Sequence, residues 1–464
     1  MVGGYSISRC TWSPSPLNST SREPKSSHTL RITCSQVVSS SSVRTPRRYL
    51  VTKTKWTCRA ETTERPRLYS GSETIDQCYS LGVQLRYQYR VYPTPGQQDM
   101  LARSFGCARV VFNDCLRIHQ DAYASGVKLS DTAVQKQVVT AAKKTPERAW
   151  LGEVASVVLV QACQDARRAY RNWFDSLSGK RKGRKVGAPR FRSRRDNRQA
   201  IRLTRNGFSN RPNGKLYVAK VGELEVAWSR DLPSEPSSVT IVKDAAGRYF
   251  ASFVVETTDE PLPPVDAEVG IDLGLATFAV LSNGKTISSP KFLRRAERKL
   301  RKAQQVLSRK EKGSNNRVKA RIRVAKAHAR VSDARKDWAH KHSTAIIREN
   351  QAVFVEDLCV RGLARTRLAK SVHDAGWGMF TRMVEEKAAR YGRTFVKVDR
   401  FYPSSQICSQ CGVRGGPKPL SIREWACKAC EAVHDRDVNA AKNIHAAGRA
   451  EWLNACGGAV SLLS

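Results

Sequence analysis

Apolar and polar residues alternate over 83–91 and again over 214–256, and the residues between these two stretches show helical spacing. Residues 83–91 alternate in the manner of a strand. The segment Pro93-Thr94-Pro95 has the composition of a helix start, and apolar residues then recur at helical spacing over 97–125 and over 130–177. Strand patterns, separated by glycine-containing turns, return over 214–256. This order predicts a small β-barrel interrupted by a helical domain.

A second β system begins at Val269, after a linker that contains three prolines. Residues 270–280 form two apolar stretches separated by a glycine, and 352–358 form another short apolar stretch. Between them, residues 291–348 have the pattern of two long helices, broken near Gly313. The sequence therefore predicts an α+β, multidomain protein.

Residues 1–82 differ from the rest, because they are rich in serine and threonine and lack a sustained helical or strand period. Two interpretations are open: a disordered tail, or an extension that is absent from the native protein, with Val83 as a GUG start codon. The segment has no charged stretch followed by an apolar core, so it does not predict a secretory signal. It resembles a transit peptide only weakly.

The charge of the chain points to a polyanionic partner. The 464 residues include 81 Lys and Arg against 41 Asp and Glu, a net charge of +40, with 40% hydrophobic residues. Such a charge would repel itself in a free compact protein, and nucleic acid is the default partner that neutralises it. An anionic membrane surface is the rival, but the chain contains no apolar run of about 18 residues. We therefore expect no membrane association.

Two segments concentrate this charge. Residues 180–211 carry 13 Lys or Arg and one acid, broken by glycine and proline, which predicts a basic loop that follows phosphates; a solvated linker is the alternative. Residues 291–348 carry 20 Lys or Arg against four acids, whereas a solvated face normally mixes charge signs. The candidate nucleic-acid contacts are Arg184, Lys185, Arg190, Arg192, Arg317, Lys319, Arg321 and Arg323.

Three acidic residues that are far apart in sequence stand at the ends of predicted elements. Asp272 lies in an apolar strand, Glu356 ends another, and Asp437 opens a helix. A carboxylate on a central strand is costly unless it binds a metal or is paired, and two Mg²⁺ ions in a phosphodiesterase site need such oxygens. Asp435 competes with Asp437, and we favour Asp437, with Asp435 as a helix cap or an assisting residue. His434 is a weaker candidate, more typical of a solvent-facing turn.

Four of the thirteen cysteines form one tight pattern. Two C-x2-C pairs, separated by fifteen residues, are typical of a closed four-thiolate zinc ribbon with one structural Zn²⁺; they are Cys408, Cys411, Cys427 and Cys430. The other nine cysteines are scattered singly, which favours a reducing, cytoplasmic location over a disulfide framework.

These motifs together resemble the TnpB family, the insertion-sequence proteins often called transposases, which are related to compact type V CRISPR effectors. The resemblance covers roughly residues 83–447 and rests on these segments: Gly270-Ile271-Asp272-Leu273-Gly274-Leu275, Val355-Glu356-Asp357-Leu358, Asp374-Ala375-Gly376-Trp377, Asp399-Arg400-Phe401-Tyr402-Pro403-Ser404-Ser405, and Asp435 through Ile444.

The resemblance implies a RuvC-like nuclease with an RNase H fold, in which Asp272, Glu356 and Asp437 are the three catalytic acids. It also implies a wedge-type β-barrel with an inserted helical recognition domain, a guide RNA transcribed from the transposon end, and Mg²⁺-dependent cleavage of double-stranded DNA in a bacterial or archaeal cytosol. The expected parts are an N-terminal extension (1–82), the wedge barrel (83–96 and 181–260), the recognition domain (97–180), the nuclease domain (265–405 and 433–464, with a basic hairpin at 291–348) and the zinc ribbon (406–432).

Three rival functions predict different behaviour. A DNA-binding regulator would bind without metal-dependent cleavage. A transposase that joins DNA strands would use similar acids but need no guide RNA. A CRISPR effector would take its guide from a processed array, which only the neighbouring DNA would reveal.

Overall fold

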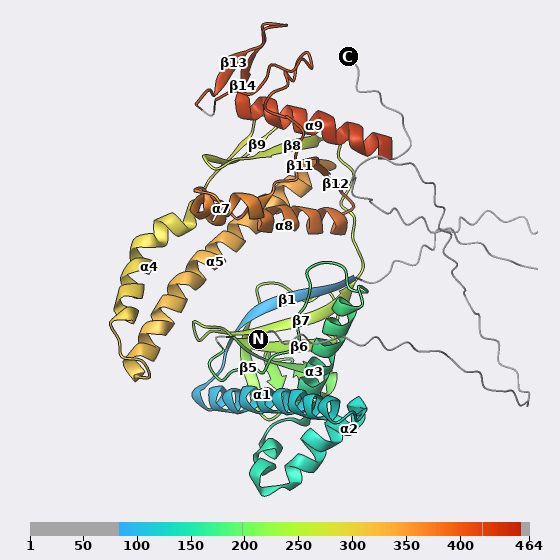
Figure 1. Cartoon of the computed structure of the whole chain (residues 1–464), viewed down its shortest axis with the longest axis vertical. Coiled ribbons are helices and arrows are strands. Elements are labelled where there is room, and N and C mark those ends of the chain that lie inside the picture. The colour runs from blue at the N-terminus through green and yellow to red at the C-terminus, as the bar shows by residue number, and fades with distance from the viewer. Residues whose placement is uncertain (1–82, 197, 420, 456–464) are drawn as a thin grey trace, which may run out of the picture. The chain divides into compact units, whose positions relative to one another are not determined.

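The computed structural model describes residues 83–196, 198–419 and 421–455, and all statements below concern these residues (Figure 1). The predicted extension 1–82 and the end of the predicted nuclease segment, 456–464, lie outside them. No helix in the described ranges has both the length and the apolar character that a membrane span requires.

Residues 83–257 contain one antiparallel sheet of seven strands in the order β2-β6-β7-β1-β5-β4-β3. The two edge strands are joined by a single turn of 3₁₀ helix, η4 (Arg205–Gly207), so the sheet curls towards a barrel. The strands are β1 (Val83–Tyr92), β2 (Gln199–Thr204), β3 (Phe208–Asn210), β4 (Leu216–Val218), β5 (Gly222–Ala227), β6 (Ser238–Lys243) and β7 (Tyr249–Thr257).

The predicted basic loop over 180–211 is too long. Residues 199–204 are strand β2, which buries Ile201 and Leu203 in alternation and pairs with β6 along its whole length. The density of basic residues obscured this short alternation, in which Arg202 is the polar residue between Ile201 and Leu203.

The helical insertion begins where the sequence predicts. Helix α1 (Pro95–Ala124) has Thr94 as its N-cap: the Thr94 hydroxyl accepts from the Gln97 amide at 3.4 Å, and the Gln97 side chain accepts from the Thr94 amide at 3.0 Å. One face of α1 packs against α3 (Ser156–Leu177), and the shared core extends into the seven-stranded sheet.

The prediction of helix throughout 130–177 is wrong in the middle. Helix α2 (Asp131–Gln135) continues into the π-helix η1 (Lys136–Ala141) and the 3₁₀ helices η2 (Ala142–Lys144) and η3 (Pro146–Glu153). Thr145 is extended because it precedes Pro146, whose ring disfavours a helical conformation in the residue before it.

The second sheet has five strands in the order β10-β9-β8-β11-β12. Strands β8, β9 and β10 pair antiparallel, whereas β8, β11 and β12 are parallel, with helical segments in the connections. The strands are β8 (Glu268–Leu273), β9 (Thr277–Leu281), β10 (Thr286–Ser288), β11 (Ala352–Glu356) and β12 (Thr394–Val398).

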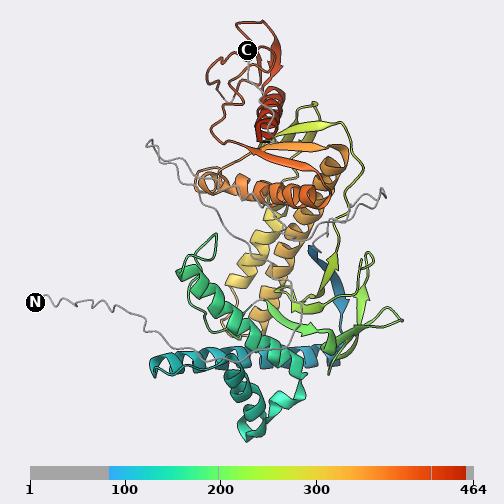
Figure 2. The ribbon, with the colours of Figure 1, turned by 90° about the vertical axis from the view of Figure 1, so that its right-hand side faces the viewer.

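Helices cover both faces of this sheet. In β11, Val353 and Val355 contact the core formed with helices α5 and α8, whereas Ala352 and Phe354 contact α9 on the other face (Figures 1 and 2). Burial on two sides explains why β11 is apolar throughout instead of alternating.

The basic hairpin consists of α4 (Phe292–Ser308) and α5 (Asn315–Glu349), with the break where the sequence predicts it. The buried Asp374 carboxylate accepts from the backbone amides of Leu293 and Arg294 at 2.8 and 3.2 Å, which caps the start of α4. Three short or medium helices follow β11: α6 (Val360–Leu363), α7 (Ala369–Ala375) and α8 (Trp377–Arg390).

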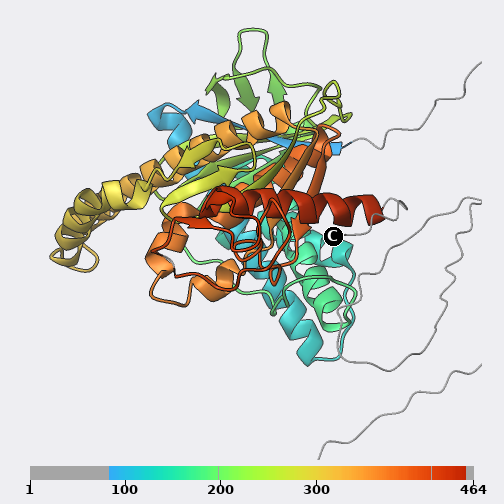
Figure 3. The ribbon, with the colours of Figure 1, turned by 90° about the horizontal axis from the view of Figure 1, so that it is seen from above.

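The cysteine-rich segment contains one small hairpin, β13 (Glu424–Ala426) and β14 (Val433–Asp435), and β14 leads directly into α9 (Arg436–Ala455). Figure 3 shows this segment beside the start of α9. The boundary predicted at residue 432 therefore separates residues that form one hairpin.

Candidate nuclease site and zinc site

The three predicted acids line one cavity of about 650 Å³. Asp272 lies on the central strand β8, Glu356 is the last residue of the neighbouring parallel strand β11, and Asp437 is in the first turn of α9. The carboxyl ends of the two parallel strands meet at one edge of the sheet, and α9 starts beside them (Figure 1).

A close approach of α9 to β8 brings Asp437 to this edge. A Cβ atom on Gly270 would lie 2.2 Å from the Ala441 carbonyl oxygen, and one on Gly448 would lie 2.5 Å from the Phe354 ring. Only glycine leaves room for helix and sheet at these two points. Gly270 of the Gly-Ile-Asp segment thus has a packing role, two residues before the acid.

Burial and like charge act together on Asp272. Burial raises the pKa of its carboxyl from 3.8 to about 7; the carboxylates of Glu356 and Asp437 add to the rise, and the Arg436 guanidinium opposes it. Burial also raises the pKa of Glu356, with a smaller contribution from Asp357. A cation bound among these carboxylates would offset the cost of ionising them in a buried site.

Asp435 and Asp437 have different roles in the structure. The Asp435 carboxylate accepts from the backbone amides of Asp437 and Val438 at 3.0 and 2.8 Å, so it caps α9. Asp437 lines the cavity, and its two oxygens lie 3.4 and 3.3 Å from one nitrogen of Arg423 in the cysteine-rich segment.

Two asparagines of α9 attach this segment to the helix, a role that sequence reasoning missed. The buried Asn439 side chain donates to the Ile407 carbonyl at 2.8 Å and accepts from the Ser409 amide at 2.9 Å. Asn443 donates to the carbonyls of Ser404 and Ile407 at 2.8 and 2.7 Å. The sequence did carry a signal for this role, because the two asparagines follow Asp437 one helical turn apart and so lie on the same face of the predicted helix.

The rim of the cavity combines arginines with apolar side chains. Besides Arg423, the residues Arg400, Arg414 and Arg436 line it, together with leucines and the exposed ring of Phe401. Arg400 forms an ion pair with Asp357, the residue that follows Glu356. Sequence reasoning did not single out Arg423, because a chain with 81 basic residues gives no signal for one arginine, and it quoted Phe401 within a family segment without assigning it a role.

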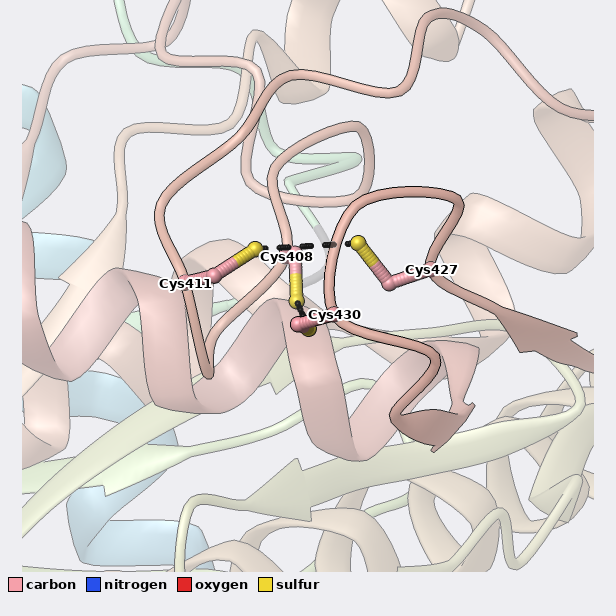
Figure 4. Close-up of side chains that lie close together, drawn as sticks. All are labelled: Cys408, Cys411, Cys427 and Cys430. Atoms are coloured by element: carbon pink, nitrogen blue, oxygen red, sulfur yellow. Dashed lines mark hydrogen bonds between the residues drawn. The ribbon is translucent and has the colours of Figure 1, made fainter.

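The four cysteines of the predicted zinc ribbon lie together in Figure 4. Their sulfur atoms are all within 4.8 Å of one another, and they are the one such group of potential metal ligands in the described ranges. The Cys408–Cys430 and Cys411–Cys427 sulfurs are 3.7 and 3.6 Å apart. A tetrahedral zinc site with Zn–S bonds of about 2.3 Å has edges of about 3.8 Å, so the donor set fits a zinc ion.

His434 is buried, contrary to the interpretation as a solvent-facing turn residue. Its Nε2 lies 3.0 Å from the Cys408 sulfur, and its ring packs against Trp425 with centroids 4.8 Å apart. A ring N–H at this place donates to the Cys408 sulfur and so supports a ligand of the candidate metal site.

The predicted nucleic-acid contacts fall into two groups. Arg192 and Arg317 have partners within the chain: Arg192 stacks on Phe112 and pairs with Asp165, and Arg317 donates to the Leu307 and Lys310 carbonyls. The other six are exposed: Arg184, Lys185, Arg190, Lys319, Arg321 and Arg323.

Three family models match the chain. One described as "Probable transposase" matches residues 252–367, one described as "Cas12f1-like, TNB domain" matches 377–444, and one described as "Helix-turn-helix domain" matches 83–128. The last range forms strand β1 and the single long helix α1 in this structure.

Curated relatives cover most of the chain. A Streptomyces pristinaespiralis protein named "Putative RNA-guided DNA endonuclease" is 44% identical over 379 residues, which are 81% of this chain and 91% of the relative. An Escherichia coli K12 protein named "Putative RNA-guided DNA endonuclease InsQ" is 28% identical, covering 80% of this chain and 93% of the relative. Among solved structures, a Cas12f1 complex with guide RNA and target DNA aligns with a TM-score of 0.50 at 12% identity, covering 78% of this chain and 99% of the Cas12f1 chain. That likeness supports a shared fold.

Proposed function

The chain belongs to the TnpB family, and we propose that it is an insertion-sequence endonuclease that a guide RNA directs to double-stranded DNA and that cuts with Mg²⁺. The observation that carries the proposal is the convergence of Asp272, Glu356 and Asp437 from three separate elements on one cavity with an arginine-rich rim. The RNA guide and the DNA target enter the proposal from the names of the relatives, which are called RNA-guided DNA endonucleases.

The three carboxylates would hold two Mg²⁺ ions, as the chemistry of the donor set suggests. Bound ions of this kind activate a water molecule and stabilise the leaving oxygen of a phosphodiester. The protein supplies the ionised carboxylates: Asp272 has to lose its proton, and the pair between Asp437 and Arg423 has to open for Asp437 to bind a cation. The freed Arg423 would then be placed to contact a phosphate at the rim.

The architecture supports the remaining parts of the proposal. The mixed five-stranded sheet with helices on both faces would be the RuvC-like RNase H fold, and the seven-stranded sheet the wedge domain. Helices α1 to α3 would form the recognition domain, and residues 406–432 the zinc ribbon with one structural Zn²⁺. The net charge of +40 and the exposed basic side chains fit a guide RNA and a DNA duplex, and the reduced cysteines fit the cytoplasm.

The alternative is a DNA-binding transposase or regulator that acts without RNA. The ribbon and the basic hairpin would fit such a protein, and the family description as a transposase favours it. The two functions differ in their dependence on RNA and on Mg²⁺, which one experiment can measure.

The experiment starts by expressing the protein with its native flanking DNA and sequencing the RNA that co-purifies. The complex is then given a plasmid target matching the guide, with and without Mg²⁺. We expect cleavage only with RNA and Mg²⁺, and none with Asp272→Ala, whose RNA content should stay normal. Asp266→Ala, which removes an exposed acid shortly before β8, is the matched control and should cut like the wild type. Cleavage without RNA, or full activity of Asp272→Ala, would contradict the proposal.

A further inference from the structure

A large aromatic side chain is exposed at the rim of the nuclease cavity. Phe401 has 86% of its surface exposed and lines the same cavity as the three acids. The next residue, Tyr402, packs against the small core between the sheet and α9. The chain thus presents one aromatic ring to water and covers its neighbour, although Phe401 is the more apolar of the two.

The turn that carries Phe401 is held by hydrogen bonds at three points. The Phe401 amide donates to the Asp399 carboxylate at 2.7 Å, and the Tyr402 amide donates to the Asp399 carbonyl at 3.0 Å. Arg400, between them, is paired with Asp357 at the end of β11. The backbone that carries the ring is therefore held close to Asp357, the residue after Glu356.

The surroundings of the ring identify the chemistry it would meet. Arg400, Arg414, Arg423 and Arg436 line the cavity with it, and these are phosphate-binding groups. Cationic side chains that follow a backbone, together with an aromatic platform, are how proteins bind single-stranded nucleic acid. The arginines and the exposed ring at this rim thus have the features of a single-strand binding site.

We propose that Phe401 stacks on one base of the DNA strand being cut and thereby positions the scissile phosphate at the three acids. This inference rests on the proposed function and adds a positioning residue to it. Stacking does not read the identity of the base, because every base has an aromatic face. The ring would therefore fix where the strand is cut while leaving sequence choice to the guide.

Loss of the ring should slow cutting without affecting assembly. Stacking on one base contributes about 5- to 150-fold in binding, so we expect Phe401→Ala to cut more slowly by a factor in this range. Phe401→Trp should stay within about threefold of the wild type, because it keeps an aromatic face. Phe401→Leu keeps an apolar side chain without that face and should behave like Phe401→Ala.

The deciding experiment combines the protein change with removal of a base. The guide-loaded complex is given a target with an unpaired bubble, so that duplex opening does not limit the rate, and single abasic residues are placed in turn around the cleavage position. For the wild type, one abasic position should slow cutting by the same factor as Phe401→Ala. In Phe401→Ala that abasic position should have no further effect, because ring and base contribute through one contact.

Further readouts separate positioning from folding and from the proposed function. The content of co-purified RNA, measured with Asp272→Ala and the double variant Asp272→Ala/Phe401→Ala, should be equal. A rate for Phe401→Ala within twofold of the wild type, or additive effects of the two changes, would overturn the inference while leaving the nuclease intact. A wild-type complex that cuts no target would overturn the proposed function and this inference with it.

Discussion

The Asp272 carboxylate should reduce the stability of the Mg²⁺-free protein, and Asp272→Asn tests this. The pKa of the group rises from 3.8 to about 7 on folding, because it is buried beside Glu356 and Asp437. Each pKa unit corresponds to 1.36 kcal/mol, so the ionised group costs about 4 kcal/mol at pH 8. Asparagine has nearly the same shape and carries no charge. Asp272→Asn should therefore be more stable than the wild type at pH 8.

The pH dependence gives the sign of this effect. Below about pH 3 the carboxyl is largely protonated in both the folded and the unfolded chain, so the two proteins differ little. Between about pH 4 and pH 7 the unfolded chain loses a proton that the folded protein keeps, and the wild type becomes less stable as the pH rises. Above about pH 7 the folded protein ionises too and the difference levels off. The advantage of Asp272→Asn should grow by roughly 3 kcal/mol between pH 5 and pH 8.

The assay is hydrogen exchange of the β8 and β11 amides in Mg²⁺-free buffer at several pH values, corrected for intrinsic exchange rates. It reports the opening free energy of the nuclease sheet alone, which a multidomain melting curve does not. Asp266→Asn, at an exposed acid, is the control and should show no pH-dependent difference. Added Mg²⁺ at pH 8 should protect the wild type and not Asp272→Asn. Equal protection of both proteins at pH 8 without Mg²⁺ would refute the reasoning.

Three further changes test other parts of the site. Cys408→Ser should lower the zinc content from one ion per chain to none, measured by elemental analysis, whereas Cys359→Ser at an exposed cysteine should retain it. Asp435→Ala should destabilise α9 by about 0.5 to 2 kcal/mol through loss of its cap, with Asp435→Asn close to the wild type in the same exchange assay. Replacing Lys319, Arg321 and Arg323 together by alanine should reduce the slope of the logarithm of the RNA-binding constant against the logarithm of salt concentration by about 0.7 to 0.9 for each lost phosphate contact. An unchanged slope would show that these residues of the hairpin do not contact the RNA.

Local signals predicted those parts of the fold that depend on neighbouring residues. The spacing of two C-x2-C pairs was sufficient for the sulfur cluster, since few other sites use it. Thr94 and Pro95 placed the start of α1. Pro146 also carried a signal, and the long apolar periodicity around it obscured the break before it.

Contacts between distant segments could not be predicted in the same way. Arg423 meets Asp437 because the β13–β14 hairpin folds back on the start of α9, and no periodicity encodes that return. Gly270 is explained only by the packing of α9, because a Cβ atom at this position would lie 2.2 Å from the Ala441 carbonyl oxygen, whereas glycine in a strand usually indicates a bulge. The three acids were foreseen as a group, but their depth, and hence the raised pKa of Asp272, depends on this packing.

The same contacts bear on how independent the zinc ribbon is. Residues 404–409 are hydrogen-bonded to Asn439 and Asn443, the Cys408 sulfur contacts His434, and Arg423 pairs with Asp437. All these partners lie between 434 and 443, within about two turns of Asp437. A rigid shift of the ribbon would break several of these bonds at once and leave buried asparagine groups without partners, at about 1 to 3 kcal/mol each. The cysteine-rich segment therefore forms part of the wall of the cavity that Asp437 lines. Loss of a metal ion bound by the four cysteines should displace Asp437, although the ion and Asp437 are not in direct contact.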